Sequence, residues 1–117
     1  MPLPPLKDQF DALLRLPSIS CTQADLDQSN LPVVELLASW LNDLGFECRI
    51  LPIANQPGKA NLLASFGSGP GGLVMAGHTD TVPCNPERWQ HDPFALTEAN
   101  NRWYGLGSCD MKGFFPL

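Results

Sequence analysis

The sequence is poor in positive charge and has no long apolar run. Seven lysines and arginines face twelve acidic residues in 117 positions, which gives a formal charge of −5. Phosphate binding needs clustered basic residues, whereas these are dispersed, which argues against a nucleic-acid surface. No stretch approaches the roughly 18 consecutive apolar residues of a membrane span, and residues 1–5 lack the features of a signal peptide. We expect a cytoplasmic protein without nucleic-acid or membrane partners.

Closely spaced cysteines are also absent. Cys21, Cys48, Cys84 and Cys109 lie far apart and form no Cys-x-x-Cys motif, so neither a zinc ribbon nor a redox motif is supported. In a reducing compartment they are expected to be free thiols. Cys109 adjoins Asp110, and neighbouring side chains of an extended loop diverge. We therefore favour a small packing residue at position 109 over a metal ligand.

The chain contains no repeat, linker or low-complexity stretch, and its length fits one small domain. Apolar residues recur at helical spacing between Leu6 and Leu14. Pro5 precedes this stretch and Pro17 follows it, which suits the tolerance of proline at the start of a helix and its stop effect later. A first helix is predicted here.

A second helix is predicted from about Ser29 to Leu44. Ser29 or Asn30 can cap its start, Pro32 suits its first turn, and Gly45 supplies a left-handed exit. Its buried stripe is expected to consist of Val34, Leu37, Leu41 and Leu44.

Three strands are predicted after this helix. Apolar and charged residues alternate over residues 46–51, which indicates a strand with one exposed face, and residues 61–66 form a second strand. After a glycine-rich turn at 67–72, the apolar residues 73–76 predict a short, buried central strand. His78 would then lie just past the end of a central strand, where open α/β sheets place their ligand sites.

A histidine and two aspartates are the candidate site residues. His78 and Asp80 point the same way on an extended strand, and a zinc-ligating imidazole usually donates its other N–H to a carboxylate. We interpret His78 as a metal ligand and Asp80 as the carboxylate that orients it. Asp110 lies in a glycine-bracketed loop after a predicted strand at residues 103–104. It is the predicted second ligand, able to bridge two metals.

Ordinary structural roles compete with these interpretations. His78 alone would more often be a structural histidine, and only its combination with Asp80 and Asp110 favours metal ligation. His91 has no partner at ligand spacing and is expected at the surface. Lys112 is expected to be a solvated lysine at the start of a helix.

The segments Gly77–Pro83 and Gly105–Gly113 resemble the metal-binding motifs of the M20 family of zinc-dependent amidohydrolases and exopeptidases. Further matching stretches are Leu16–Ser20, Leu26–Asn30, Asp43–Phe46, Trp89 and Asp92–Phe94. The resemblance implies an α/β fold in which helices pack on a mixed, largely parallel sheet. Residues 1–117 would be the N-terminal portion of a zinc-exopeptidase-like catalytic domain, which is incomplete at this length.

The resemblance also implies roles for single residues. His78 matches the ligand of one metal, Asp110 the bridging ligand, and Asp80 the carboxylate behind the histidine, which we class as catalytic. The family binds two Zn²⁺ or Co²⁺ ions, of which this chain would hold at most a partial site. The remaining ligands and the general base are expected beyond Leu117, as is the lid domain that forms the family's homodimer. A cis peptide between Asp110 and Met111 is a further implication.

The implied reaction is hydrolysis of an N-acyl amino acid. The matches favour hydrolysis of N2-acetyl-L-ornithine to L-ornithine and acetate, a step of arginine biosynthesis, by the full-length parent, while this chain alone is expected to be inactive. Desuccinylation of succinyl-diaminopimelate is an alternative, although desuccinylases would more typically carry valine at Thr81 and arginine near Leu106. Two further alternatives are hydrolysis of dipeptides and a non-catalytic, truncated remnant. Such a remnant would only bind metal or associate with another protein.

Overall fold

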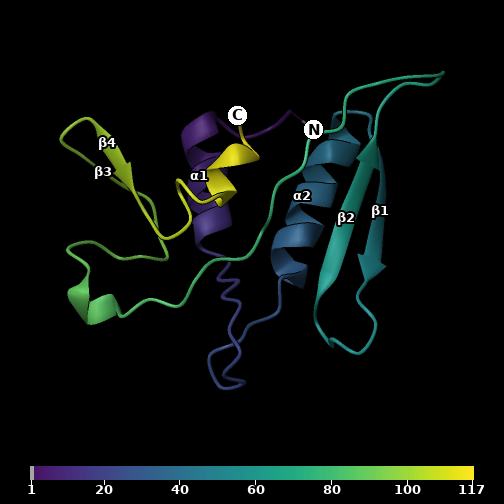
Figure 1. Cartoon of the computed structure of the whole chain (residues 1–117). Helices are drawn as coiled ribbons and strands as arrows, with labels where there is room; N and C mark the ends of the chain where they lie inside the picture. Colours follow the sequence, from purple (N-terminus) through teal and green to yellow (C-terminus); the bar gives the residue numbers. More distant parts are fainter. Residues whose placement is uncertain (1) are drawn as a thin grey trace.

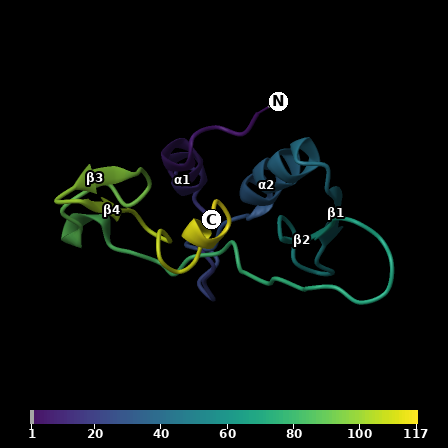
Figure 2. The ribbon, with the colours of Figure 1, turned by 90° about the horizontal axis from the view of Figure 1, so that it is seen from above.

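Helices, β-hairpins and short 3-10 helices alternate along the computed structural model, which describes residues 2–117. In chain order the elements are α1 (Leu6–Leu14), α2 (Leu31–Asp43), β1 (Glu47–Pro52), β2 (Ala60–Ser65), η1 (Pro86–Arg88), β3 (Thr97–Ala99), β4 (Arg102–Tyr104) and η2 (Lys112–Phe114). The β1–β2 hairpin lies beside α2, and the β3–β4 hairpin lies on the far side of α1 (Figure 1). The view from above shows the same order (Figure 2), and η2 contacts α1.

The first helix forms where the sequence predicts it. α1 begins directly after Pro5, because proline is tolerated where a helix starts, and it ends at Leu14, before Pro17. Its buried face includes Phe10 and Leu13, which are 7% and 1% exposed. The prediction of this helix is confirmed.

The second helix is confirmed, but its cap differs from the expectation. Asn30 occupies the N-cap position without a side-chain capping bond, because its side chain bonds instead to the backbone of Ala60 and to the hydroxyl of Thr79. The hydroxyl of Ser29 accepts from the N–H of Leu31 at 3.1 Å. Asn30 therefore ties α2 to β2 and to the segment that carries His78.

The buried stripe of α2 is partly as predicted. Val34 and Leu37 are buried, and Val33 is fully buried beside them. Leu44 is 51% exposed, contrary to the prediction. The helix ends at Asp43, so Leu44 lies outside the helical repeat that would place it against the core.

Both sheets of the described residues are antiparallel hairpins, so the expectation of a largely parallel sheet is wrong. β1 pairs with β2 from Glu47 opposite Ser65 to Pro52 opposite Ala60, and β3 pairs with β4. The connection over residues 53–59 is long enough for a hairpin but too short for the crossover of a dozen or more residues that parallel strands need. Among residues 2–117, parallel pairing occurs only as an isolated bridge between Ile19 and Thr81.

The predicted central strand at residues 73–76 is also wrong. This segment forms no ladder within the described chain, and Leu73, Val74 and Met75 are 86%, 91% and 72% exposed. An apolar run is buried as a strand only where neighbours cover both its faces, and no described strand pairs with it. The Cα radius of gyration of 15.2 Å accordingly exceeds the roughly 13 Å of a compact domain of this length.

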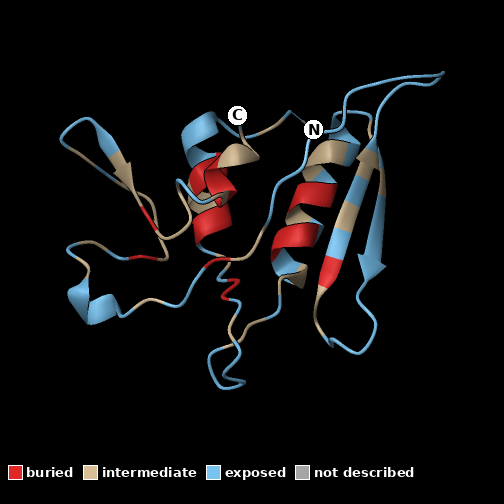
Figure 3. Ribbon diagram, viewed as in Figure 1, coloured by how far each residue is buried: buried red, intermediate tan, exposed pale blue. Residues whose placement is uncertain are grey.

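The core lies where the helices meet the first hairpin. Leu13, Val33 and Leu37 form the buried cluster, and the half-buried residues packed on it are Leu16, Leu36, Trp40, Leu62 and Phe115. Burial is concentrated in α1, α2 and the start of β2, while both hairpin tips are exposed (Figure 3). No helix among residues 2–117 is long and apolar enough to span a membrane.

Candidate metal centre

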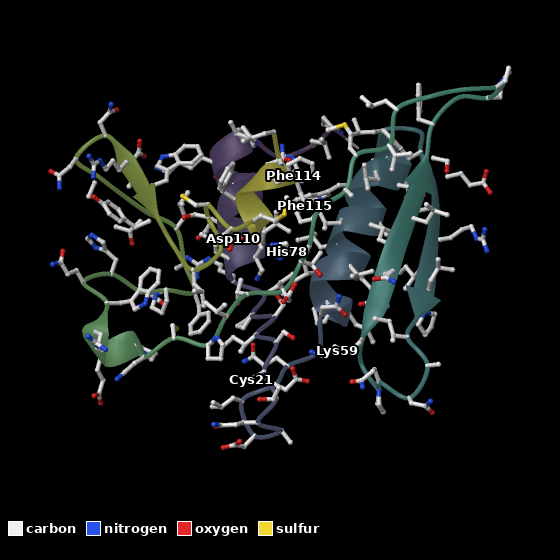
Figure 4. The ribbon with its side chains drawn as sticks, in the orientation of Figure 1. Cys21, Lys59, His78, Asp110, Phe114 and Phe115 are labelled. Carbon is white, nitrogen blue, oxygen red and sulfur yellow. The ribbon has the colours of Figure 1, made fainter. Side chains whose placement is uncertain are left out.

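The structure brings His78, Asp80 and Asp110 together. The Nε2 atom of His78 lies 2.9 Å from Oδ1 of Asp110, across 32 positions of sequence. Its Nδ1 atom lies 3.1 Å from Oδ1 of Asp80 and 3.1 Å from the Asp80 carbonyl oxygen. His78 and Asp110 meet beside η2, close to the centre of the molecule (Figure 4). One imidazole is thus placed between two carboxylates.

Backbone hydrogen bonds hold the loop of His78 on the segment that follows α1. The hydroxyl of Ser18 donates to the carbonyl of Thr79 at 2.6 Å. The N–H of Thr81 donates to the carbonyl of Ser18 at 3.0 Å, and the N–H of Ser20 donates to the carbonyl of Thr81 at 2.9 Å. Both ends of this pairing are buried, since Ser18 is 1% and Thr81 5% exposed. The backbone on both sides of Asp80 is therefore held in place by hydrogen bonds.

The loop of Asp110 packs closely against neighbouring residues, because glycines occupy its positions of closest contact. A Cβ atom on Gly105 would lie 2.3 Å from Cδ1 of Leu14, and one on Gly113 would lie 2.1 Å from the carbonyl oxygen of Ser108. Only residues without a side chain permit these approaches. The peptide between Asp110 and Met111 is cis, which confirms the expectation drawn from the resemblance.

Lys112 is buried, so the prediction of a solvated lysine is wrong. Its side chain is 2% exposed, and Nζ donates to the carbonyls of Leu13 and Leu16 at 3.1 and 2.7 Å. Burial lowers the pKa of Lys112 to about 8, so the ammonium form still predominates at neutral pH. The sequence pattern missed this residue because its partners are backbone carbonyls almost a hundred positions earlier.

An open pocket of about 330 Å³ surrounds the three site residues and is lined by His78, Asp80–Val82 and Gly105–Asp110. The side chains of His78 and Asp80 are each 49% exposed and that of Asp110 is 85% exposed. Cys109 is an exposed free thiol that also lines this pocket, so the expectation of a packing residue is wrong. A tight turn, unlike an extended loop, presents consecutive residues to the same space.

Other candidate residues stay outside this pocket. His91 is half-buried and packs its ring on Tyr104, with centroids 4.7 Å apart. All four cysteines are free, as expected. Among residues 2–117, no group of three or more histidine, cysteine, aspartate or glutamate side chains is arranged to hold a metal ion.

The donor atoms fit one part of a zinc site. Nitrogen and carboxylate oxygen are both zinc ligands, with bonds of roughly 2 Å, so two ligands of one tetrahedral ion lie roughly 3.3 Å apart. Nε2 of His78 and Oδ1 of Asp110 are 2.9 Å apart and would need only a small outward adjustment. A structural or catalytic zinc normally has at least three protein ligands, so these two residues fit a partial site.

The surroundings of His78 favour its protonated form. Desolvation, the largest single influence, lowers the pKa of His78, but hydrogen bonds with the Asp80 carbonyl and the Asp110 carboxylate, together with both negative charges, raise it above the ordinary 6.5. When the ring is protonated, both of its N–H groups can donate to these oxygens. A zinc ion bound at Nε2 would have to displace the proton there, so protons would compete with metal for this residue.

Zinc affinity should consequently decrease as the pH is lowered, and this decrease should begin at a pH above 6.5. Because the folded chain holds the His78 proton more tightly than the unfolded chain does, protonation also stabilises the fold at acid pH, and this stabilisation is lost as pH rises through the raised pKa. Calorimetric zinc titrations at a series of pH values, beside an NMR titration of the ring, measure both effects. In Asp80→Asn the midpoint should move downward. A wild-type midpoint at or below 6.5 would contradict the prediction.

Comparison with known proteins identifies a family that this chain resembles. Residues 74–115 match the sequence model of Peptidase family M20/M25/M40, a stretch that contains His78, Asp80 and Asp110. Over 115 residues the chain is 55% identical to the acetylornithine deacetylases of Salmonella arizonae, Photorhabdus laumondii and Klebsiella pneumoniae. Each alignment covers 98% of this chain but only 30% of the relative. The chain is therefore similar to peptidase family M20/M25/M40 over residues 74–115 and spans about 30% of the length of these relatives.

Proposed function

We propose that this chain supplies part of the metal centre of an amidohydrolase that converts N2-acetyl-L-ornithine to L-ornithine and acetate. The observation that carries the proposal is the 2.9 Å approach of His78 Nε2 to Asp110 Oδ1 in an open pocket. The reaction itself is proposed from the relatives, which are named acetylornithine deacetylases. Homodimerisation and a cytoplasmic location belong to the same proposal.

The three residues divide the work of holding an ion. Asp80 faces Nδ1 of His78 at 3.1 Å, and a carboxylate there keeps the proton on Nδ1 and leaves the lone pair of Nε2 free to bind metal. Asp110 would supply oxygen ligands, and as a carboxylate it could hold a second ion as well. Zn²⁺ or Co²⁺ suits this nitrogen and oxygen set. When bound, the metal supplies Lewis-acid polarisation of the amide carbonyl and lowers the pKa of water.

The chain alone is expected to be inactive. Amide hydrolysis also needs a general base within hydrogen-bond reach of the attacking water. No glutamate lines the pocket of the described residues, and the one carboxylate besides Asp110, that of Asp80, faces His78. We therefore assign Asp80 an orienting role and expect the base to come from another part of the complete enzyme.

A chimera tests the proposal. The matching 115 residues of the Photorhabdus laumondii relative are replaced by those of this chain, which are 55% identical. The zinc-loaded chimera should hydrolyse N2-acetyl-L-ornithine, and the isolated chain should not. The chimera with His78→Ala should lose the activity, whereas the chimera with His91→Ala should keep it, because His91 lies outside the pocket.

Substrate comparison in the chimera decides between reactions. A folded, zinc-binding chimera that prefers succinyl-diaminopimelate or a dipeptide would contradict the proposed substrate while leaving the metal centre in place. Activity that survives His78→Ala would contradict the metal-ligand role. Turnover by the isolated chain would contradict the view that its general base lies elsewhere.

Association without catalysis is a second candidate function, and one observation favours it. Leu73, Val74 and Met75 are all more than 70% exposed and consecutive, and contiguous apolar surface promotes binding to other proteins or to further copies. Size-exclusion chromatography with light scattering separates a monomer from an associating chain. A monomer at all concentrations would remove self-association from consideration.

A further inference from the structure

Lys112 joins the loop of Asp110 to the end of α1. Its ammonium group donates to the carbonyls of Leu13 and Leu16. Leu13 is in the last turn of α1, where the carbonyls lie at the negative end of the helix dipole and a cation is favoured. Its carbonyl also accepts a long hydrogen bond of 3.4 Å from the N–H of Leu16, and Leu16 itself lies just beyond the helix. The lysine is therefore matched to this place by charge and by hydrogen bonding, and it lies only two residues after Asp110.

Both halves of the candidate site depend on the same short segment. The loop of His78 is hydrogen bonded to residues 18–20 through Thr79 and Thr81. The loop of Asp110 is bound through Lys112 to residues 13–16. Residues 13–20, which are the end of α1 and its exit, thus act as the common support for two side chains that are 32 positions apart in sequence.

The Asp110 carboxylate has little other restraint. It is 85% exposed, and its hydrogen bond is to the ring of His78. Gly113 packs its backbone near Phe10 of α1, where an added Cβ would lie 2.6 Å from Cε1. This contact is non-polar, as is the packing of Phe115 on the core cluster. The two bonds of Lys112 are directional, so they add a fixed orientation to the position that this packing gives.

We propose that Lys112 is a positioning residue, which anchors η2 to the carbonyl end of α1 and thereby holds Asp110 at bonding distance from His78. The metal-ligand part of this inference rests on the proposed function. The geometric part does not, because the distance between the two side chains can be measured without metal. The role also explains why a lysine is buried at this position, where a methionine would fill a similar volume.

The test uses the whole chain and two readouts. NMR measures nuclear Overhauser contacts between the His78 ring and the Asp110 methylene group without metal, and calorimetry measures the affinity for zinc alone. In Lys112→Met the contacts should disappear and zinc affinity should fall about 10- to 100-fold, the usual cost of losing a group that orients a ligand. Contacts between Phe46 and Phe66, 5.2 Å apart in the first hairpin, should persist and show that the fold is kept.

Controls make each outcome decisive. Lys7→Met removes a lysine from α1 that forms an exposed ion pair with Glu98, and it should change neither readout. Retention of the His78 contacts in Lys112→Met would overturn the inference, and so would their loss in a variant that binds zinc as tightly as a zinc-binding wild type. If Lys112→Met does not fold, Lys112→Gln keeps one donor group and should weaken both readouts; unchanged values would overturn it. Loss of the contacts in a chain that never binds zinc supports the positioning role and contradicts the proposed function.

Discussion

Replacing His78 by alanine is expected to abolish detectable zinc binding by this chain. The described residues offer two ligands at one point, so removing either leaves a single carboxylate or imidazole. Loss of an outer-sphere partner already costs about 10- to 100-fold in metal affinity, and loss of a direct ligand should cost at least about 100-fold. A site with two ligands binds zinc weakly to begin with. A further loss of this size therefore makes zinc binding too weak for calorimetry to detect.

Matched variants isolate this effect. Asp110→Asn keeps the shape of the side chain but removes its charge, and it should weaken zinc binding as severely as His78→Ala. His91→Ala removes the other histidine of the chain, which packs on Tyr104, and should leave zinc binding unchanged. Equal affinity in wild type and His78→Ala would show that zinc binds elsewhere, and the proposed centre would be wrong.

Truncation of Leu13 to alanine is expected to destabilise the chain by about 2–5 kcal/mol, the range for buried leucines. Leu13 is 1% exposed and belongs to the central cluster with Val33 and Leu37. The cost includes lost transfer free energy and the cavity left behind. Because small domains are stable by only about 5–15 kcal/mol, and this chain exposes many apolar side chains, the variant should be largely unfolded at moderate denaturant concentration.

Urea unfolding followed by circular dichroism measures the change. Leu6→Ala is the control, since Leu6 starts the same helix but is 42% exposed, and exposed substitutions usually change stability by about 0.5 kcal/mol or less. Similar midpoints for Leu13→Ala and Leu6→Ala would mean that α1 does not pack on α2 as the structure shows. Leu13→Ala should also reduce zinc affinity, because its carbonyl belongs to the segment that supports Asp110.

Local patterns identified the two helices and the two strands of the first hairpin, but not the antiparallel pairing of these strands. Proline before and after α1 and the apolar spacing of Phe10 and Leu13 are properties of neighbouring residues, so they can be read without knowledge of the fold. The same is true of the pairing of His78 with Asp80, since residues two apart in an extended chain point the same way. Asp110 was associated with them through the motif that carries the family resemblance.

Most of the failed predictions concern contacts with distant residues, while those for Leu44 and Cys109 failed on local backbone geometry. The apolar run 73–76 predicted a buried strand, yet burial needs neighbouring strands, and none of the described ones pairs with it. Cys109 was expected to be a packing residue of an extended loop, but it lies in a turn and is exposed. Lys112 was expected in solvent, and its partners proved to be carbonyls at the end of α1.

The sequence by itself determined the two helices, the family resemblance and the three candidate site residues, because periodicity, proline placement and motif spacing depend on near neighbours. Tertiary structure alone decided that the two loops share one support, that Lys112 is buried, and that Nε2 of His78 lies 2.9 Å from Asp110. These facts follow from packing between segments far apart in sequence. Backbone carbonyls look the same at every position, so no residue pattern marks those of Leu13 and Leu16 as the partners of a lysine.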